Sequence, residues 1–221
     1  MVEPLGKELQ YFTLHHHRGL SWYRAHFPTL GQGQQTFEAS PYYLFHPQAP
    51  ARASAALPNA KFVALLRDPV ERAYSHYLHT RRAGAEPLSF ADALAAEPER
   101  LARAEATGLD SFAAHRIMRQ YSYASRGLYG EQVERWLHSV PRDKLHLVKS
   151  EELHADPVAR FSELLGFLGL DDFEPPSYSR HSRRSASEQS ALPDPVKESL
   201  RDYFKDDATV LLRLTGWPRA W

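Results

Sequence analysis

Apolar residues occur along this chain in short continuous runs and in helical stripes, and turn residues separate them. The run Phe62–Leu66 is followed directly by Arg67, Asp68 and Pro69. This order is typical of a buried parallel strand that ends where a helix begins. We expect Asp68 to cap that helix and Pro69 to be its first residue, because the cap satisfies free amides that proline does not possess. A second apolar run, Leu145–Val148, predicts another short strand.

The spacing of apolar residues also predicts five helices. They begin after Asp68, after Ser89, at Leu128, at Asp156 and at Asp194. Pro98 is expected to end or bend the second of them, because a proline inside a helix removes a hydrogen bond. Residues 1 to about 50 and about 174 to 192 lack a helical period. They are predicted to be loops, with short strands or turns in the first stretch.

Strands that alternate with helices predict a three-layer α/β fold, in which helices flank a parallel sheet. No internal repeat and no shift in composition divides the sequence. We therefore expect a single domain over residues 1–221.

Composition narrows the function classes. The 27 basic and 27 acidic side chains cancel, which argues against a polybasic nucleic-acid binder. The lack of cysteine excludes a disulfide framework, a thiolate metal site and a cysteine nucleophile. No apolar stretch approaches the ~18 residues of a membrane helix, and the first residues do not read as a secretory signal. We expect a cytoplasmic protein that binds no nucleic acid and has no membrane segment. The sequence leaves the oligomeric state open.

Candidate chemistry begins at the end of the first predicted strand. Arg67 stands at the carboxyl end of that strand, where open α/β sheets bind ligands. Ser75 follows about two turns into the next helix. A guanidinium and a hydroxyl at this separation can converge on one anion. The alternative is that Arg67 pairs with Asp68 or Glu71 and that Ser75 is a solvated helix position.

This segment, L-P-x-A-K followed by R-D-P-x-x-R-A-Y-S-x-Y, resembles the cofactor segment of the sulfotransferases, especially the heparan-sulfate type. Further stretches, from Lys7–Phe12 to Gly216-Trp217, extend the resemblance over nearly the whole chain. It implies a sulfotransferase fold similar to that of the P-loop NTPases. It also implies the co-substrate 3′-phosphoadenosine 5′-phosphosulfate, with Arg67 and Ser75 on its 3′-phosphate. The acceptor would be a hydroxyl or amine of a carbohydrate or small molecule.

The resemblance places Glu8 where the family has its general base, and Lys7 beside it is a cation for the leaving phosphate. The alternative for Glu8 is an exposed acid without a role. On the acceptor side, the resemblance implies contacts from Gln10, Ser40, Tyr121 and Ser122. Ordinary packing is an equal alternative for Tyr121.

The sequence departs from the family pattern in two places. Family members begin with a strand and a K-x-G-T-T/S loop whose amides hold the 5′-phosphosulfate, and Val2–Lys7 contains neither. We expect the first β-loop-α unit to be missing, through a late start codon, a shortened chain or loss of catalysis. The second departure is the loop that usually carries K-G-R. Arg183 and Arg184 would replace it there, or else form a solvated basic loop.

Other readings stay open or are disfavoured. A degenerate homologue would bind the nucleotide or a glycan without catalysis. A nucleoside-phosphate kinase relative is disfavoured, because neither a G-x-x-x-x-G-K-[ST] loop nor a magnesium carboxylate is evident. Three adjacent histidines, His15–His17, cannot all face one ion in an irregular segment. We therefore expect no metal.

Overall fold

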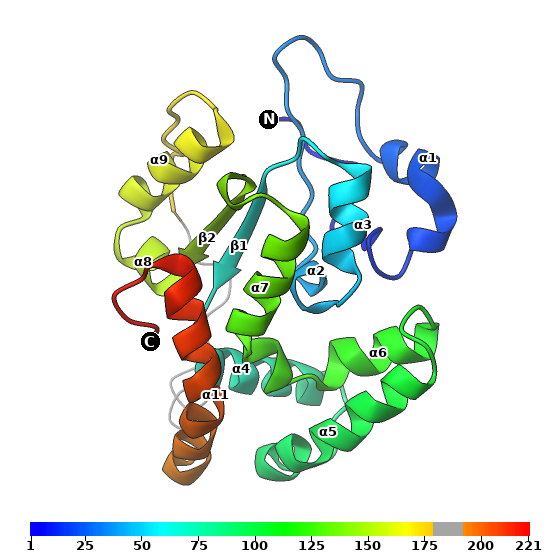
Figure 1. Cartoon of the computed structure of the whole chain (residues 1–221), viewed down its shortest axis with the longest axis vertical. Coiled ribbons are helices and arrows are strands. Elements are labelled where there is room, and N and C mark those ends of the chain that lie inside the picture. The colour runs from blue at the N-terminus through cyan, green and yellow to red at the C-terminus, as the bar shows by residue number, and fades with distance from the viewer. Residues whose placement is uncertain (179–191) are drawn as a thin grey trace.

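A computed structural model describes residues 1–178 and 192–221 and places two parallel strands among helices (Figure 1). Strand β1 (Phe62–Leu66) pairs with β2 (Leu145–Lys149), with Phe62 opposite Leu145 and Leu66 opposite Lys149. Within the described residues the sheet consists of these two strands. The predicted α/β class, with a parallel sheet and flanking helices, is confirmed.

Helices make up most of the remaining structure. In chain order they are α1 (Gly19–Arg24), α2 (Tyr42–Phe45), α3 (Ala49–Ala56), α4 (Pro69–Arg82), α5 (Phe90–Ala106), α6 (Phe112–Tyr121), α7 (Tyr129–Ser139), α8 (Ser150–Ala155), α9 (Pro157–Leu168) and α11 (Asp194–Thr215), with 3-10 turns η1 (His16–Arg18), η2 (Ser125–Gly127) and η3 (Arg142–Lys144). Helices α7 and α11 pack against each other, and α5 and α6 form a hairpin at one end of the molecule (Figure 1). Helices α8 and α9 pack beside β2 (Figure 1).

The start of α4 follows from its sequence. Asp68 Oδ1 accepts hydrogen bonds from the amides of Val70 and Glu71, at 2.9 and 3.0 Å, and Pro69 is the first helical residue. The predicted apolar stripe lies in the core, where Tyr74 and Tyr77 stack at a ring distance of 6.2 Å. The prediction of this helix and its cap is confirmed.

Several helical features differ from expectation. The first 50 residues, predicted to be loops with short strands or turns, contain α1 and α2, and helices α3 and α8 were not predicted either. Pro98 does not end α5, which continues to Ala106. An interior proline costs about 3 kcal/mol. The packing of α5 on α6 offsets this, as does Glu97, whose carboxylate accepts a 2.7 Å hydrogen bond from the amide of Ala124. Helix α6 was not predicted, although Ser111 caps it by accepting from the amide of Ala114 at 3.1 Å.

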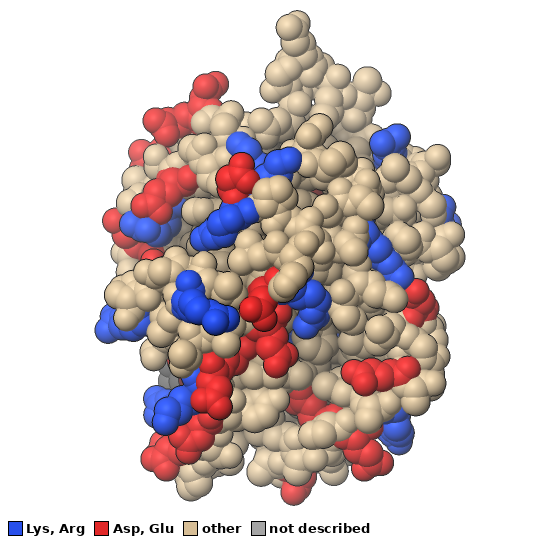
Figure 2. Space-filling view, viewed as in Figure 1, with Lys and Arg blue, Asp and Glu red and all other residues tan. Residues whose placement is uncertain are grey.

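The two faces of β1 differ in their environment. Phe62 packs on Trp136 of α7, with ring centroids 5.1 Å apart, and Leu66 is fully buried. On the opposite face Val63 and Leu65 are 37% and 53% exposed. Basic and acidic side chains are interspersed over the visible surface, with wide uncharged areas between them (Figure 2). Among the described residues, no helix combines the length and apolar character needed to cross a bilayer.

Candidate functional site

The segment that carries Glu8 has an unusual backbone. Glu8 and Gln10 have φ angles of 50° and 52°, which place two non-glycine residues in the left-handed region. Side-chain hydrogen bonds hold this conformation. Gln10 Nε2 donates to Glu8 Oε2 at 3.0 Å, and Thr13 Oγ1 donates to Gln10 Oε1 at 3.0 Å. Strained backbone of this kind is often found at functional sites, and here it fixes the Glu8 carboxylate.

Ser40 supports the same segment from a distant part of the chain. Its hydroxyl accepts from the Gln10 amide at 3.2 Å and donates to Glu38 Oε2 at 3.0 Å. Burial raises the pKa of the Glu38 carboxyl, and hydrogen bonds from Tyr43 and Ser40 oppose that rise. Ser40 is itself buried, and its hydroxyl positions Gln10. The contact between Ser40 and the acceptor, which the resemblance implies, stays a prediction.

A cavity of about 530 Å³ opens next to Glu8. Its walls come from the N-terminal segment, α2, α4, α6 and η2. The polar residues that line it are Glu8, Gln10, His76, His79, Thr80, Arg116, Arg119, Gln120 and Arg126. Segments far apart in the sequence thus meet around one carboxylate.

Cations outnumber acids around this cavity. Glu8 is the acid among its described lining residues, and Arg119 Nη2 lies 4.0 Å from Glu8 Oε2. Burial lowers the pKa of His76 to about 2, so this ring is neutral at pH 7 and the positive charge comes from arginines. The site can bind an anion and holds a carboxylate placed to accept a proton.

The predicted nucleotide residues lie outside the walls of this cavity. Arg67 Nη2 is 3.6 Å from Glu71 Oε2, and both side chains are partly exposed. Such a solvent-exposed pair is weak and leaves Arg67 able to bind another anion. Ser75 is half-buried on α4, and Lys7 is exposed. The shared phosphate contact stays a prediction, and Arg183 and Arg184 lie outside the described residues.

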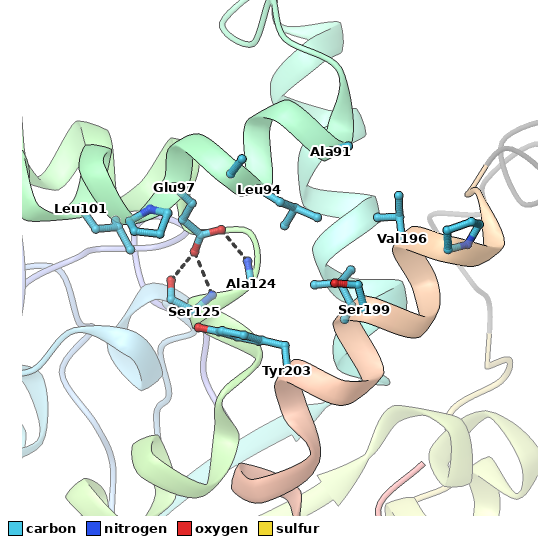
Figure 3. Close-up of a pocket in the computed structure, with 13 residues that line it drawn as sticks. Ala91, Leu94, Glu97, Leu101, Ala124, Ser125, Val196, Ser199 and Tyr203 are labelled. Carbon is cyan, nitrogen blue, oxygen red and sulfur yellow. Dashed lines mark hydrogen bonds between the residues drawn. The ribbon is translucent and has the colours of Figure 1, made fainter.

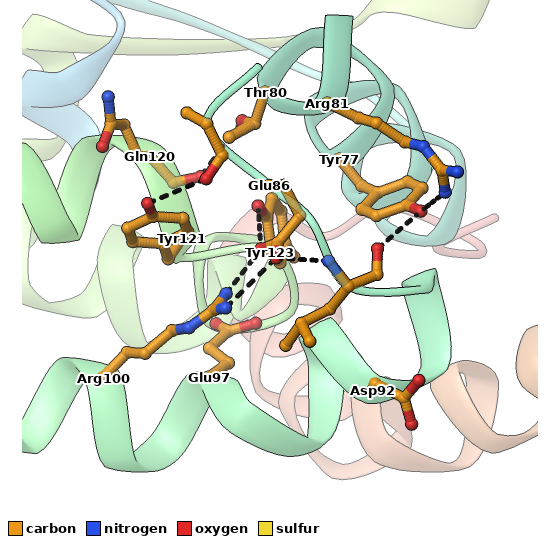
Figure 4. A network of polar contacts seen from close by, with 12 residues as sticks. Tyr77, Thr80, Arg81, Glu86, Asp92, Glu97, Arg100, Gln120, Tyr121 and Tyr123 are labelled. Carbon is orange, nitrogen blue, oxygen red and sulfur yellow. Dashed lines mark hydrogen bonds and ion pairs between the residues drawn. The ribbon is translucent and has the colours of Figure 1, made fainter. Parts of the chain in front are cut away.

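Tyr121 and Ser122 make polar contacts within the protein, and Tyr121 belongs to the network in Figure 4. The Tyr121 hydroxyl donates to the Ala85 carbonyl at 3.0 Å, and the Arg100 guanidinium lies 4.4 Å from its ring. Ser122 is fully buried and donates to the Met118 carbonyl. The structure therefore does not bring these two side chains to the cavity surface. Arg126 was not among the residues predicted from the sequence, where the one local signal for it is its place directly before the G-L-Y stretch.

A second cavity, of about 570 Å³, lies between α5 and the start of α11 (Figure 3). Its lining is mostly apolar and includes Leu94, Val196 and Tyr203. Its acid, Glu97, accepts hydrogen bonds from the amides of Ala124 and Ser125 and from the Ser125 hydroxyl. With this carboxylate already occupied, the cavity is less suited to catalysis than the one beside Glu8.

His46, Asp110 and His115 offer ligand atoms that lie within 4.8 Å of one another. The Nε2 atoms of both histidines are buried without a hydrogen-bond partner, which a metal could explain. However, Arg52 donates to both oxygens of Asp110 at 2.7 and 2.8 Å. The Gln48 amide donates to His46 Nδ1 at 3.3 Å, which puts the proton on Nε2. These contacts fit a buried neutral histidine pair better than a metal centre.

Comparisons with known proteins show which proteins this chain is similar to. A family model described as a sulfotransferase domain matches residues 5–192. The heparan sulfate glucosamine 3-O-sulfotransferase 3A1 of Mus musculus is 32% identical over 169 residues, which are 76% of this chain and 39% of that protein. The bifunctional heparan sulfate N-deacetylase/N-sulfotransferase 3 of Homo sapiens is 32% identical over 74% of this chain and 18% of its own length.

Among solved structures, the crystal structure of a sulfotransferase from Alicyclobacillus acidocaldarius superposes with a TM-score of 0.79 at 28% identity. The superposition covers 99% of this chain and 86% of that one. The chain spans about two fifths of the length of the mammalian 3-O-sulfotransferases that it matches.

Proposed function

Because this chain belongs to the sulfotransferase domain family, we propose that it transfers a sulfuryl group from 3′-phosphoadenosine 5′-phosphosulfate to a carbohydrate. The observation that carries the proposal is the family match over residues 5–192, which contains both Glu8 and the segment from Arg67 to Ser75. Heparan sulfate is the acceptor named for the mammalian relatives. For this chain we propose a hydroxyl or amine of a related glycan.

In the proposed reaction, Glu8 takes the proton from the acceptor group as its oxygen or nitrogen attacks sulfur. The bond between sulfur and the bridging oxygen of the nucleotide's 5′-phosphate breaks, and that oxygen keeps the electron pair. The hydrogen bond from Gln10, at 3.0 Å, supports the role of Glu8 because it fixes the carboxylate beside the cavity. Lys7 is the proposed cation that stabilises the charge on the leaving phosphate.

Arg67 and Ser75 are proposed to hold the 3′-phosphate of the nucleotide. Asp68 fixes the turn between them, since its side chain caps α4 and its amide donates to Glu151 Oε1 at 2.9 Å. A rigid turn at the end of β1 keeps Arg67 at a fixed position relative to α4, which contains Ser75. Arg67 suits this role because its planar fork matches a phosphate.

Nucleotide binding tests the first half of the proposal. Calorimetric titration with adenosine 3′,5′-bisphosphate should show one site, and Arg67→Ala should weaken it by tenfold or more, since charged hydrogen bonds contribute about 1.5–3 kcal/mol. Arg24→Ala, at an exposed arginine on α1, is the matched control and should bind normally. Absence of any heat with the wild-type chain would reject the nucleotide site.

Sulfate transfer to heparan oligosaccharides tests the second half. Glu8→Gln should lower kcat by roughly 10²–10⁴, the usual contribution of a general base, with unchanged bisphosphate affinity. Glu3→Gln, an exposed acid in the same segment, should retain full activity. A wild-type chain that binds the nucleotide but transfers no sulfate to any acceptor would identify the non-catalytic binding homologue instead.

A further inference from the structure

Arg126 differs from the other arginines of the interior in its partners. Its guanidinium carbon lies 5.0 Å from the ring centre of Tyr42 and 5.4 Å from that of Phe45. Its Nη2 makes a long, 3.4 Å hydrogen bond to the Met118 carbonyl, and its Nε is buried without a partner. Among the described residues no carboxylate forms an ion pair with it. Burial lowers the pKa of Arg126 to about 9.

The contrast with neighbouring arginines shows how unusual this is. Arg100 pairs with Glu86, and Arg52 pairs with Asp110 at 2.7 Å. Arg72 also lacks a carboxylate and has a buried Nε without a partner, but its Nη2 donates to two backbone carbonyls, those of Ser122 and Tyr123. Aromatic faces stabilise a cation, but they do not replace the counter-ion or the hydrogen bonds that a desolvated guanidinium loses.

The acid whose charge reaches Arg126 is Glu97. Its carboxylate is already engaged, because it accepts from the amides of Ala124 and Ser125 and from a hydroxyl. Arg126 itself is partly exposed and lines the cavity that contains Glu8. The remaining donors of its guanidinium are therefore available on the cavity side.

We propose that Arg126 binds one anionic group of the acceptor, a sulfate or a carboxylate, in the Glu8 cavity and so selects acidic glycans. The inference rests on the proposed function for the identity of the acceptor. A planar guanidinium that packs against two neighbouring aromatic rings and donates to a carbonyl is preorganised for bidentate binding of such a group. Arg119, exposed at the same cavity, adds positive charge near the entering ligand.

Stability separates a binding role from a structural one. Arg126→Met keeps a flexible apolar side chain against Tyr42 and Phe45 and removes the unpaired charge. We expect the Tm of the ligand-free variant to be unchanged or up to roughly 4 °C higher than that of wild type. Arg72→Met, which breaks two hydrogen bonds to the backbone, should lower Tm. A structural role for Arg126 predicts instead that both variants lose stability, and that result would count against the proposal.

Binding gives the decisive measurement. Calorimetric titration with an N-sulfated heparan oligosaccharide should show a Kd about tenfold or more higher for Arg126→Met than for wild type. Arg126→Lys, which keeps the charge but not the planar fork, should fall between the two. An equal Kd for wild type and Arg126→Met would overturn the proposal.

Modified glycans identify the anionic group. The same titrations use an N-desulfated, N-acetylated oligosaccharide and a carboxyl-reduced one. The form for which wild type and Arg126→Met have the same Kd lacks the group that Arg126 binds. If adenosine 3′,5′-bisphosphate is the probe whose affinity changes and the glycans are unaffected, Arg126 serves the donor and the inference is wrong.

Failure of this inference is distinguishable from failure of the proposed function. Oligosaccharide binding that depends on Arg126 without sulfate transfer would reject the function and keep the inference. Sulfate transfer that is insensitive to Arg126→Met, on acidic and neutral acceptors alike, would keep the function and reject the inference.

Discussion

The carboxylate of Glu86 is buried between α4 and α5, where it receives several hydrogen bonds (Figure 4). Arg100 Nη2 donates to it at 3.1 Å, the Tyr123 hydroxyl at 2.8 Å and the Leu88 amide at 3.2 Å. Burial acts to raise the pKa of Glu86, but the hydrogen bonds from Arg100, Tyr123 and Leu88 outweigh it and hold that pKa below its usual value. The ionised side chain thus ties α5 to the segment that leads into η2.

Replacing this carboxylate tests its structural role. Glu86→Gln keeps the shape but leaves Arg100, whose side chain is 15% exposed, without its counter-charge. We expect the free energy of unfolding to fall by about 1–3 kcal/mol, measured by urea denaturation. Glu99→Gln, at an exposed position of the same helix, should change it little. Equal stabilities of the two variants would show that the network contributes nothing.

At the scale of elements, α7 is capped by a residue from another helix. Its own Leu128 provides no side-chain cap. Asp207 of α11 accepts hydrogen bonds from the amides of Gly130 and Glu131, at 2.8 and 2.9 Å. This contact is why glycine is needed at position 130. A Cβ atom there would lie 2.5 Å from the carbonyl oxygen of Asp207.

Two glycine substitutions should therefore act in opposite directions. Gly166 lies in α9 with open space where a Cβ atom would stand, so Gly166→Ala should stabilise the protein by up to about 1 kcal/mol through helix propensity. Gly130→Ala has the same propensity gain but forces α7 away from α11, and we expect net destabilisation of about 1–3 kcal/mol. Thermal unfolding of both variants gives the sign directly. Two shifts of the same sign would contradict the close approach of these helices.

The predictability of elements depended on whether their signals were local. Helix α4 could be predicted because Asp68 and Pro69 mark its start within two residues. The continuation of α5 past Pro98 could not be predicted. Helix α5 is kept continuous by its packing on α6 and by the hydrogen bond that Glu97 accepts from the amide of Ala124, 27 residues further along the chain. Helix α6 escaped prediction because its buried face includes His115, a residue that the apolar pattern does not count.

At the scale of the whole molecule, the candidate site could likewise be predicted only where its signals are local in the sequence. Glu8 and Gln10 were found by resemblance, and the structure places both on one cavity. Their left-handed backbone and the gathering of Glu8, Arg119 and Arg126 around one cavity depend on contacts between distant segments, so no local pattern shows them. A chain with zero net charge can therefore contain a cavity whose lining has more cations than acids.

At the scale of the whole molecule, the interior also contains neutral histidines, among them His46 and His76. Burial lowers the pKa of His46 to about 4 and that of His76 to about 2, from 6.5 in the unfolded chain. Below pH 6.5 the unfolded chain therefore binds protons that the folded protein does not. The stability that these residues contribute is complete above pH 6.5 and is lost as the pH falls toward the folded pKa values.

Acidification should therefore destabilise the protein well before its carboxylates titrate. Each of the two histidines removes about 1.4 kcal/mol per pH unit below pH 6.5, so urea unfolding at pH 7.5, 6.5, 5.5 and 5.0 should show a decline that begins near pH 6.5. His76→Gln should make that decline shallower, whatever its effect on absolute stability, because it removes one of the groups that bind protons only in the unfolded chain. His138→Gln, at an exposed position of α7, should leave the slope unchanged. A flat profile between pH 7.5 and 5.0 would mean that water or a proton reaches these rings in the folded protein, and the cavity beside Glu8 would then carry the charge of His76 as well as that of its arginines.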